Sequence, residues 1–185
     1  MRATLPPSPF PHRRLNVVGT SSSGKTTFAR ALADTLSVPH VELDALHWQP
    51  GWTGVVPSEM RRRVTDVVRS HAWVIDGNYS VTRDIVWERA EAVVWLDYPL
   101  PTILYRYAAR TWRRLRSGEE IWPGTGNRER LSTIVGREAL LWWILTTYRR
   151  RRRDYPRLLA ANPRLAAYRI STPAEATAWL AAVRI

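Results

Sequence analysis

The stretch that decides the fold is GTSSSGKTT, residues 19–27, which follows the apolar run LNVVG (15–19) and opens the helical pattern KTTFARALADTL (25–36). Residues 19–26 match G-x-x-x-x-G-K-[ST] in full, and strand, loop and helix are the setting in which this pattern binds phosphate. Backbone N–H groups of such a loop turn toward the phosphate, and glycine permits the close approach. We therefore predict a phosphate-binding loop, formed by Gly19, Ser21, Ser22, Ser23, Gly24, Lys25, Thr26 and Thr27.

Lys25 is the only lysine among the 28 lysines and arginines of the chain. A compact ammonium group fits between the β- and γ-phosphates of a nucleoside triphosphate, whereas a guanidinium is wider and planar. The Thr26 hydroxyl is expected to hold Mg²⁺. The guanine-reading Asn-Lys-x-Asp pattern is absent from the sequence, which favours ATP over GTP. ATP and Mg²⁺ are thus the expected cofactors.

Length and composition favour one domain without cysteine chemistry. A chain of 185 residues can bury a single core, and it contains no cysteine and four histidines without metal-ligand spacing. Residues 1–13 hold four prolines and no apolar core, which predicts a disordered leader before a single domain at 14–185. The apolar run ALLWWIL (139–145) is far shorter than the roughly 18 residues of a membrane span. We expect a cytoplasmic protein without a membrane partner.

The net charge of +12 is concentrated in the second half of the chain. Residues 1–99 hold 11 basic and 10 acidic residues, and residues 100–185 hold 17 and 6. This imbalance indicates an anionic partner, either the phosphates of a small substrate or those of nucleic acid. A compositional bias toward arginine on a solvated surface explains the same counts equally well.

Five short apolar runs alternate with helical patterns and predict an α/β fold. The runs are LNVVG (15–19), VEL (41–43), WVI (73–75), AVVWL (92–96) and LAAYRI (165–170). Such alternation is typical of a parallel sheet covered by helices on both faces. Helices are expected at 58–69 and 101–115, from the lid to about Asp154 with an end or kink at Pro156, and after Pro173.

Asp76 stands at the end of the third run, in WVIDGNYSVTRD (73–84). The carboxyl ends of parallel strands are where such sheets present ligands, so a carboxylate there can hold Mg²⁺ together with Thr26.

Several motifs together resemble a known superfamily. GTSSSGKTT, HVELDALHWQPGW (40–52), WVIDGNYSVTRD, VVWLDYP (93–99) and GNRER (126–130) resemble the P-loop small-molecule kinases of the adenylate-kinase-like superfamily. They are most similar to the bacterial adenylate kinase-like or DNA topology modulation (FlaR-type) proteins. The resemblance implies a three-layer α/β/α P-loop NTPase fold with strand order 2-3-1-4-5. Asn78-Tyr79-Ser80 replaces part of the superfamily's DG-F-P-R run, which argues against a genuine adenylate kinase.

The resemblance also implies roles for residues downstream of the loop. Asp44 follows the second strand, where these kinases hold the phosphoryl acceptor, so it is expected to orient the attacking hydroxyl or accept its proton. The helix after the fourth strand is expected to bring arginines to the transferring group, and the glycine-rich break after it is the natural lid, at about 114–130. From these segments we select Arg110, Arg114, Arg128 and Arg130 as catalytic arginines.

Helical geometry divides residues 101–115 into two faces. At 100° per residue, Arg106, Arg110, Arg113 and Arg114 fall within an arc of about 100°. Leu104, Ala108, Trp112 and Leu115 fall on the opposite side. We expect the apolar side to pack on the core and the arginine side to face the ligand.

The nature of the acceptor stays open in the sequence. Trp48 and Trp52 suit a flat apolar wall for a ring, or they close the core. Arg61, Arg62, Arg63 and Arg83 are available to grip a phosphate on the acceptor, or they are solvated. The sequence therefore predicts a kinase for a nucleoside, a nucleotide or a related metabolite.

The alternative is a nucleic-acid-associated ATPase that uses the basic second half. The run Arg149–Arg153 points around the whole circumference of a helix, and stacking aromatics of a nucleic-acid module do not accompany it. Its expected role is a solvated face or an oligomer contact. A monomer and a homodimer fit equally.

Overall fold

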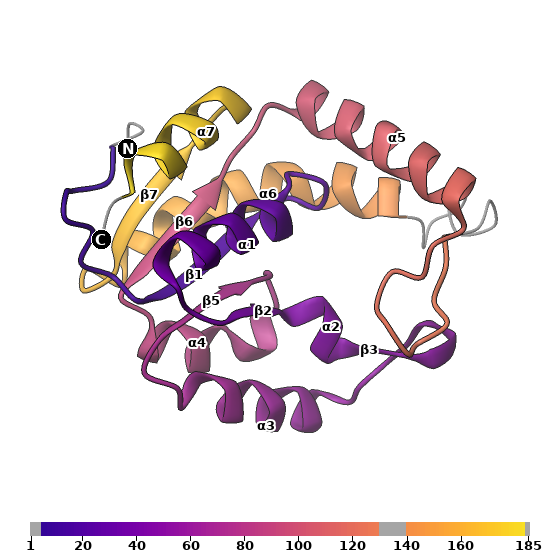
Figure 1. Ribbon diagram of the computed structural model, residues 1–185, viewed down its shortest axis with the longest axis horizontal. Helices are drawn as coiled ribbons and strands as arrows, with labels where there is room; N and C mark the ends of the chain where they lie inside the picture. The colour runs from indigo at the N-terminus through magenta and orange to yellow at the C-terminus, as the bar shows by residue number, and fades with distance from the viewer. Residues whose placement is uncertain (1–4, 130–139, 184–185) are drawn as a thin grey trace.

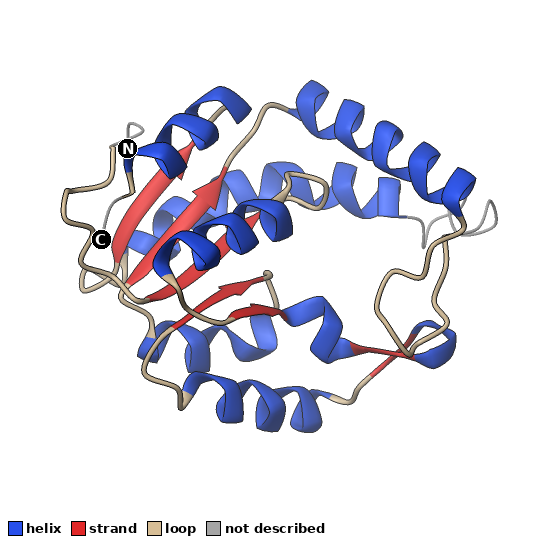
Figure 2. Ribbon diagram, in the orientation of Figure 1, coloured by secondary structure: helices blue, strands red, loops and turns tan. Residues whose placement is uncertain are grey.

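The computed structural model describes residues 5–129 and 140–183. Its centre is a parallel sheet of five strands, drawn in red in Figure 2, with the order β2-β5-β1-β6-β7. The strands are β1 (Arg14–Gly19), β2 (His40–Glu42), β5 (Trp73–Asp76), β6 (Ala92–Leu96) and β7 (Ala166–Ile170). Counted along the chain within this sheet, the order is 2-3-1-4-5, which confirms the predicted α/β fold.

Helices cover both faces of the sheet and create two cores. On one face, α1 (Lys25–Leu36), α5 (Leu100–Ser117) and α7 (Pro173–Ala182) pack over alternate residues of β1 and β6 such as Val17 and Val94. On the other face, α3 (Pro57–Val68) and α4 (Arg83–Arg89) pack over Val18 and Val93. The long helix α6 (Leu140–Ala160) contributes Ile144 to the first core and Tyr155 and Leu159 to the second. Figure 1 shows these layers.

The register of the strands brings the predicted functional segments to one edge. Gly19 is paired with Leu96, and Asp76 is paired with both Val17 and Glu42. All the strands are parallel, so their carboxyl ends meet there. The phosphate-binding loop, Asp76 and the helix that follows β2 therefore lie beside one another.

A short excursion that the sequence did not predict separates β2 from α3. It consists of α2 (Leu43–His47), β3 (Trp48–Gln49), the 3-10 turn η1 (Pro50–Trp52) and β4 (Thr53–Gly54). β3 and β4 form an antiparallel hairpin, in which Gly51 adopts a φ of 71° at the turn. A second 3-10 turn, η2 (Ser80–Thr82), leads into α4. The hairpin projects beyond the sheet edge toward the segment that follows α5 (Figure 1).

Three expectations about elements are wrong. Phe10 is 6% exposed and packs in the first core, so disorder does not extend through residue 13. α6 contains Pro156 and continues to Ala160, so the helix does not end at this proline. The third wrong expectation concerns which residues of α5 are buried.

α5 buries a different stripe from the one predicted. Its buried residues are Ile103, Tyr107 and Thr111, whereas Trp112 is 63% exposed. The arginines at 106, 110 and 114 border the buried stripe and turn partly inward. They line a polar site there, and the predicted packing residues Ala108 and Trp112 face outward.

Within the described part of the chain, no helix is long and apolar enough to cross a membrane.

Candidate active site

The phosphate-binding loop joins β1 to α1 in a strained turn. Ser22 has a φ of 67° and Gly24 a φ of 88°, and Ser23 N–H donates to Thr20 O at 3.1 Å. A Cβ on Gly24 would lie 2.6 Å from the Arg106 guanidinium, and one on Gly19 would lie 2.6 Å from the backbone oxygen of Leu96. At Gly19 the close backbone contact requires glycine, and at Gly24 the left-handed φ of 88° favours it.

The N-terminus of α1 is open to an anion. Gly24 is its N-cap and provides no side-chain hydrogen bond, so the first N–H groups of the helix lack intrahelical acceptors. Helix N-termini of this kind bind phosphate. Ser21 and Ser22 are half-buried beside it, Ser23 is fully buried and Thr27 is exposed. The Ser22 and Ser23 hydroxyls are buried without a partner among the described residues.

Lys25 points back over the loop. Its Nζ donates to Thr20 O at 3.2 Å. Burial lowers the pKa of Lys25, while the negative charges of Asp44 and Asp76 raise it in part. The ammonium group therefore faces both predicted carboxylates, as a phosphate-binding lysine would.

Thr26 and Asp76 meet as predicted. Thr26 Oγ1 donates to Asp76 Oδ1 at 3.2 Å, and His40 Nε2 lies 2.7 Å from Asp76 Oδ2. Asp76 is 2% exposed. A hydroxyl and a carboxylate are oxygen ligands of the kind that Mg²⁺ prefers, completed by water and substrate phosphates, so this pair fits the ion.

Asp44 lies in the first turn of α2. Tyr79 OH donates to Asp44 Oδ1 at 2.7 Å. Burial and the charge of Asp44 raise the pKa of Tyr79, so the phenol stays protonated and keeps donating. The bond leaves the other carboxylate oxygen, Oδ2, without a side-chain donor among the described residues.

Arg110, on α5, adds a positive charge close to Lys25 and Asp44. Its Nε and Nη2 are buried and have no partner among the described residues. Burial and the charge of Arg114 lower the pKa of Arg110, whereas the charges of Glu129 and Asp44 raise it in part. Arg106 approaches the loop itself, because its Nη1 donates to Ser23 O at 2.8 Å.

Arg151, on α6, is a site residue that the sequence analysis missed. Its Nη1 is buried without a partner in the described ranges. Burial lowers the pKa of Arg151, and the charges of both Arg151 and Arg110 act on Lys25. Position 151 stands inside a run of five arginines, so only the fold of α6 distinguishes it from its neighbours.

The other predicted arginines do not converge on Lys25. Arg114 Nη1 lies 3.4 Å from Glu129 Oε2, so its charge is compensated. Arg128 is exposed, and its Nη1 donates to Gly118 O. Arg130 lies outside the described residues. Catalytic roles for Arg114 and Arg128 would require a rearrangement of the segment after α5.

Comparisons with known proteins agree with this geometry at the level of the fold. No family model matches the chain, and no curated protein is significantly similar to it in sequence. The structure resembles a shikimate kinase from Acinetobacter baumannii, solved in complex with shikimate, at 18% identity over 91% of this chain and 89% of that one, with a TM-score of 0.55. It also resembles a shikimate kinase from Bacteroides thetaiotaomicron, at 16% identity over 92% and 96% with a TM-score of 0.54.

A gluconokinase from Sinorhizobium meliloti 1021 has a similar fold. The identity is 22% over 94% of this chain and 93% of that one, with a TM-score of 0.50. The chain has the P-loop kinase fold. This fold explains why the loop, Asp76 and Asp44 share one sheet edge. The narrower resemblance to the FlaR-type proteins is not confirmed.

Proposed function

We propose that the chain is an ATP- and Mg²⁺-dependent phosphotransferase that acts on a small hydroxyl-bearing acceptor. The observation that carries this proposal is that the buried guanidinium groups of Arg110 and Arg151 and the carboxylate of Asp44 lie close enough to Lys25 for their charges to act on its pKa. Arg110 and Arg151 keep buried N–H groups without a partner among the described residues. Unpaired buried donors are costly unless a ligand satisfies them, and phosphate oxygens suit guanidinium groups. The shikimate kinase and gluconokinase folds support the same class of reaction.

Each of these residues has a separate role in the proposed reaction. The loop and Lys25 hold the β- and γ-phosphates, and Arg110 and Arg151 offset charge on the transferring group. Thr26 and Asp76 would hold Mg²⁺, which neutralises phosphate charge when bound. Asp44 orients the acceptor hydroxyl and takes its proton. The acceptor oxygen forms a bond to the γ-phosphorus, the bond to the bridging oxygen breaks, and ADP leaves with the bonding electron pair.

The experiment is the release of ADP with and without candidate acceptors. Lys25→Ala and Lys25→Arg are expected to abolish turnover, since the former removes the charge and the latter misplaces it. Asp44→Asn should reduce kcat by about a hundredfold or more, whereas Asp34→Asn, an exposed control on α1, should not. Normal turnover by Lys25→Arg would contradict the proposal.

A nucleic-acid-associated ATPase is the competing function, and the placement of the arginine run gives it little support. Arg151 turns into the site, and Arg152 Nε lies 3.1 Å from the buried Asp97. Arg149, Arg150 and Arg153 remain exposed on α6. This function predicts salt-dependent binding of DNA or RNA and an ATPase rate that small acceptors do not change.

A further inference from the structure

We propose that the acceptor is an uncharged, hydroxyl-bearing ring compound, because the acceptor side of the site combines an aromatic wall with the neighbouring carboxyl groups of Glu42, Asp44 and Asp76. This inference rests on the proposed function and narrows its substrate. It concerns the space beside Asp44, away from the phosphate-binding loop.

An aromatic wall extends outward from Asp44. Tyr79, which holds Asp44, has its ring centroid 5.0 Å from that of His47, and the His47 ring lies 4.8 Å from Trp48. Trp122, from the segment after α5, is stacked with Trp48 at 6.3 Å and an interplanar angle of 21°. The wall is thus continuous from α2 to the segment after α5.

Trp52 completes a cluster of three tryptophans with Trp48 and Trp122. Its ring lies 5.8 Å from each of the other two, edge to face. All three side chains are half-buried, so part of each indole remains available to a ligand. Aromatic faces of this kind suit the flat or apolar side of a ring. We call Trp48, Trp52 and Trp122 the tryptophan cluster.

Polar groups near the wall suit hydroxyls. His47 Nδ1 is buried without a partner among the described residues, and burial lowers the pKa of His47, so the ring is neutral at physiological pH. A neutral imidazole nitrogen can accept a hydrogen bond from a hydroxyl or donate one to it. Asp44 Oδ2 is a second acceptor for the same ligand.

The charge on this side opposes an anionic acceptor. Glu42, Asp44 and Asp76 lie at the ends of β2, α2 and β5, and Trp122 Nε1 donates to Glu42 Oε1 at 3.3 Å. Burial raises the pKa of Glu42, and the negative charges of Asp76 and Asp44 raise it further. An acceptor with a phosphate or carboxylate would add another negative charge to this group.

The arginines of α3 are already committed to other partners. Arg61 makes a bidentate pair with Asp84, with bonds of 2.9 and 2.8 Å. Arg62 and Arg63 both bond to Glu59, and Arg63 Nη1 also donates to Leu46 O at 2.8 Å. Binding an acceptor phosphate would therefore require breaking these bonds.

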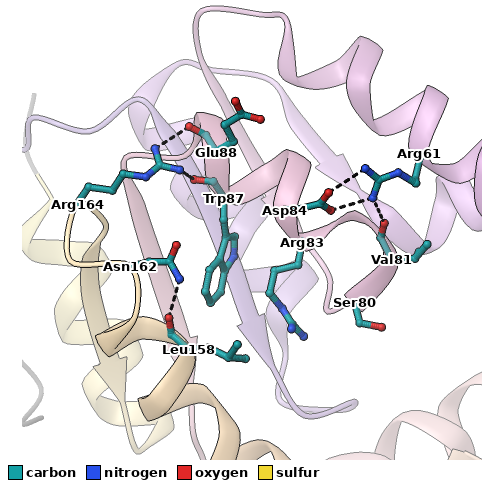
Figure 3. Close-up of a pocket in the computed structure, with 10 residues that line it drawn as sticks. All are labelled: Arg61, Ser80, Val81, Arg83, Asp84, Trp87, Glu88, Leu158, Asn162 and Arg164. Carbon is teal, nitrogen blue, oxygen red and sulfur yellow. Dashed lines mark hydrogen bonds and ion pairs between the residues drawn. The ribbon is translucent and has the colours of Figure 1, made fainter.

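Arg83 is the remaining arginine of that segment, and it lines two hollows beside α4. Its guanidinium lies 5.8 Å from the centroid of the Trp87 ring. With Trp87, Leu158 and Asn162 it lines a pocket of about 690 Å³ between α4 and the end of α6 (Figure 3). The residues that line this pocket include neither Asp44 nor Lys25. The hollow between Arg83, Tyr79 and Leu43 measures about 10 Å³, which is too small for an acceptor.

The test compares matched acceptors that differ only in charge, by ADP release from the full-length chain with ATP and Mg²⁺. The pairs are D-glucose against D-glucuronate and inosine against inosine monophosphate. We expect the uncharged member of at least one pair to give a kcat/KM about tenfold or more above its charged partner. A preference for the charged members would overturn the inference and leave the proposed kinase intact. If no compound stimulates ADP release while ATP and Mg²⁺ still raise the Tm, the proposed function itself fails.

Three variants test which side chains contact the acceptor. Trp48→Ala should raise the acceptor KM by about three- to tenfold, because a stacking face is lost, without changing the KM for ATP. Trp112→Ala, whose ring is exposed on α5, is the matched control and should change neither. Arg83→Ala should leave the acceptor KM unchanged, and a tenfold rise would show that the acceptor is an anion held by Arg83. Thermal unfolding of each variant separates a loss of fold from a loss of binding.

Discussion

At the scale of single residues, the candidate site is defined by charges that lack partners. Arg110 and Arg151 have buried donors that no described residue accepts from. Burying an unpaired cation destabilises a fold, which is why we propose a ligand role for these two. The charges of Arg110, Arg151 and Asp44 all act on the pKa of Lys25.

The first prediction is that Arg151 matters for turnover and not for folding. Arg151→Ala should lower kcat by about a hundredfold and leave the Tm unchanged or raised, because a buried unpaired charge is removed. Arg150→Ala changes the exposed neighbour on the same helix and is the matched control. Steady-state kinetics and thermal unfolding of both variants test this, and equal kinetics of the two would contradict it.

The same residues show which parts of the candidate site could be predicted from the sequence. The placement of the loop, Thr26, Asp76 and Asp44 at one sheet edge could be predicted, because a motif or a strand end fixes their positions. That of Arg151 could not, because in a run of five arginines the inward one depends on how α6 is rotated in the fold. Arg114 and Arg128 were chosen by helical position and proximity to the lid, whereas the structure pairs them with Glu129 and Gly118 O.

At the scale of elements, Asn78 connects the phosphate-binding loop to α6. Gly19 N–H donates to Asn78 Oδ1 at 3.0 Å, and Asn78 Nδ2 donates to Gly19 O. Tyr155 OH on α6 also donates to Asn78 Oδ1, at 3.0 Å. One amide side chain thus holds both backbone groups of the residue at which β1 turns into the loop, and it couples that turn to the helix that carries Arg151.

The second prediction follows from this coupling. Asn78→Ala should raise the dissociation constant for ATP about tenfold, because the first residue of the loop loses both of its side-chain hydrogen bonds. Tyr155→Phe removes only one bond to Asn78 and should have a smaller effect. Tyr148→Phe removes a hydroxyl on the same helix that bonds to Tyr98 O instead. Calorimetric titration with ATP compares the three, and an unchanged affinity in Asn78→Ala would exclude the coupling.

Two elements were not predicted correctly from the sequence, for physical reasons. The hairpin of β3 and β4 has only two residues in each strand, too few for an alternating pattern. The 3.6-residue period predicted two faces for α5, but the buried stripe of Ile103, Tyr107 and Thr111 lies between those faces. Arginines are normally outside, and here a ligand site turns several of them inward.

At the scale of the whole molecule, the two ends of the chain pack together. Phe10 meets Trp179 of α7 edge to face at 5.5 Å, and His12 Nε2 lies 3.3 Å from Tyr168 OH of β7. The four prolines in residues 1–13 led to a prediction of disorder. That prediction was wrong because it rested on composition, which does not reveal that a single phenylalanine completes a core. The rest of the architecture followed from the alternation of apolar runs and helical patterns.

The third prediction concerns the pH dependence of this contact. Burial lowers the pKa of His12 from 6.5, with partial opposition from Glu91. The unfolded state therefore binds a proton more readily than the folded one, and stability is lost as the pH falls below about 6.5. His12→Phe should reduce the drop in Tm between about pH 7 and pH 5. His71→Phe, at an exposed position, is the control. Equal slopes in all three proteins would contradict the role of His12.

The measurement that tests the central claim most directly is mass spectrometry of the acceptor after incubation with the protein, ATP and Mg²⁺. The account predicts a phosphorylated acceptor that forms in equal amount to ADP with the unaltered protein, and none with Lys25→Ala. ADP that accumulates while every acceptor keeps its original mass would contradict it, because the site would then hydrolyse ATP without transferring the phosphoryl group.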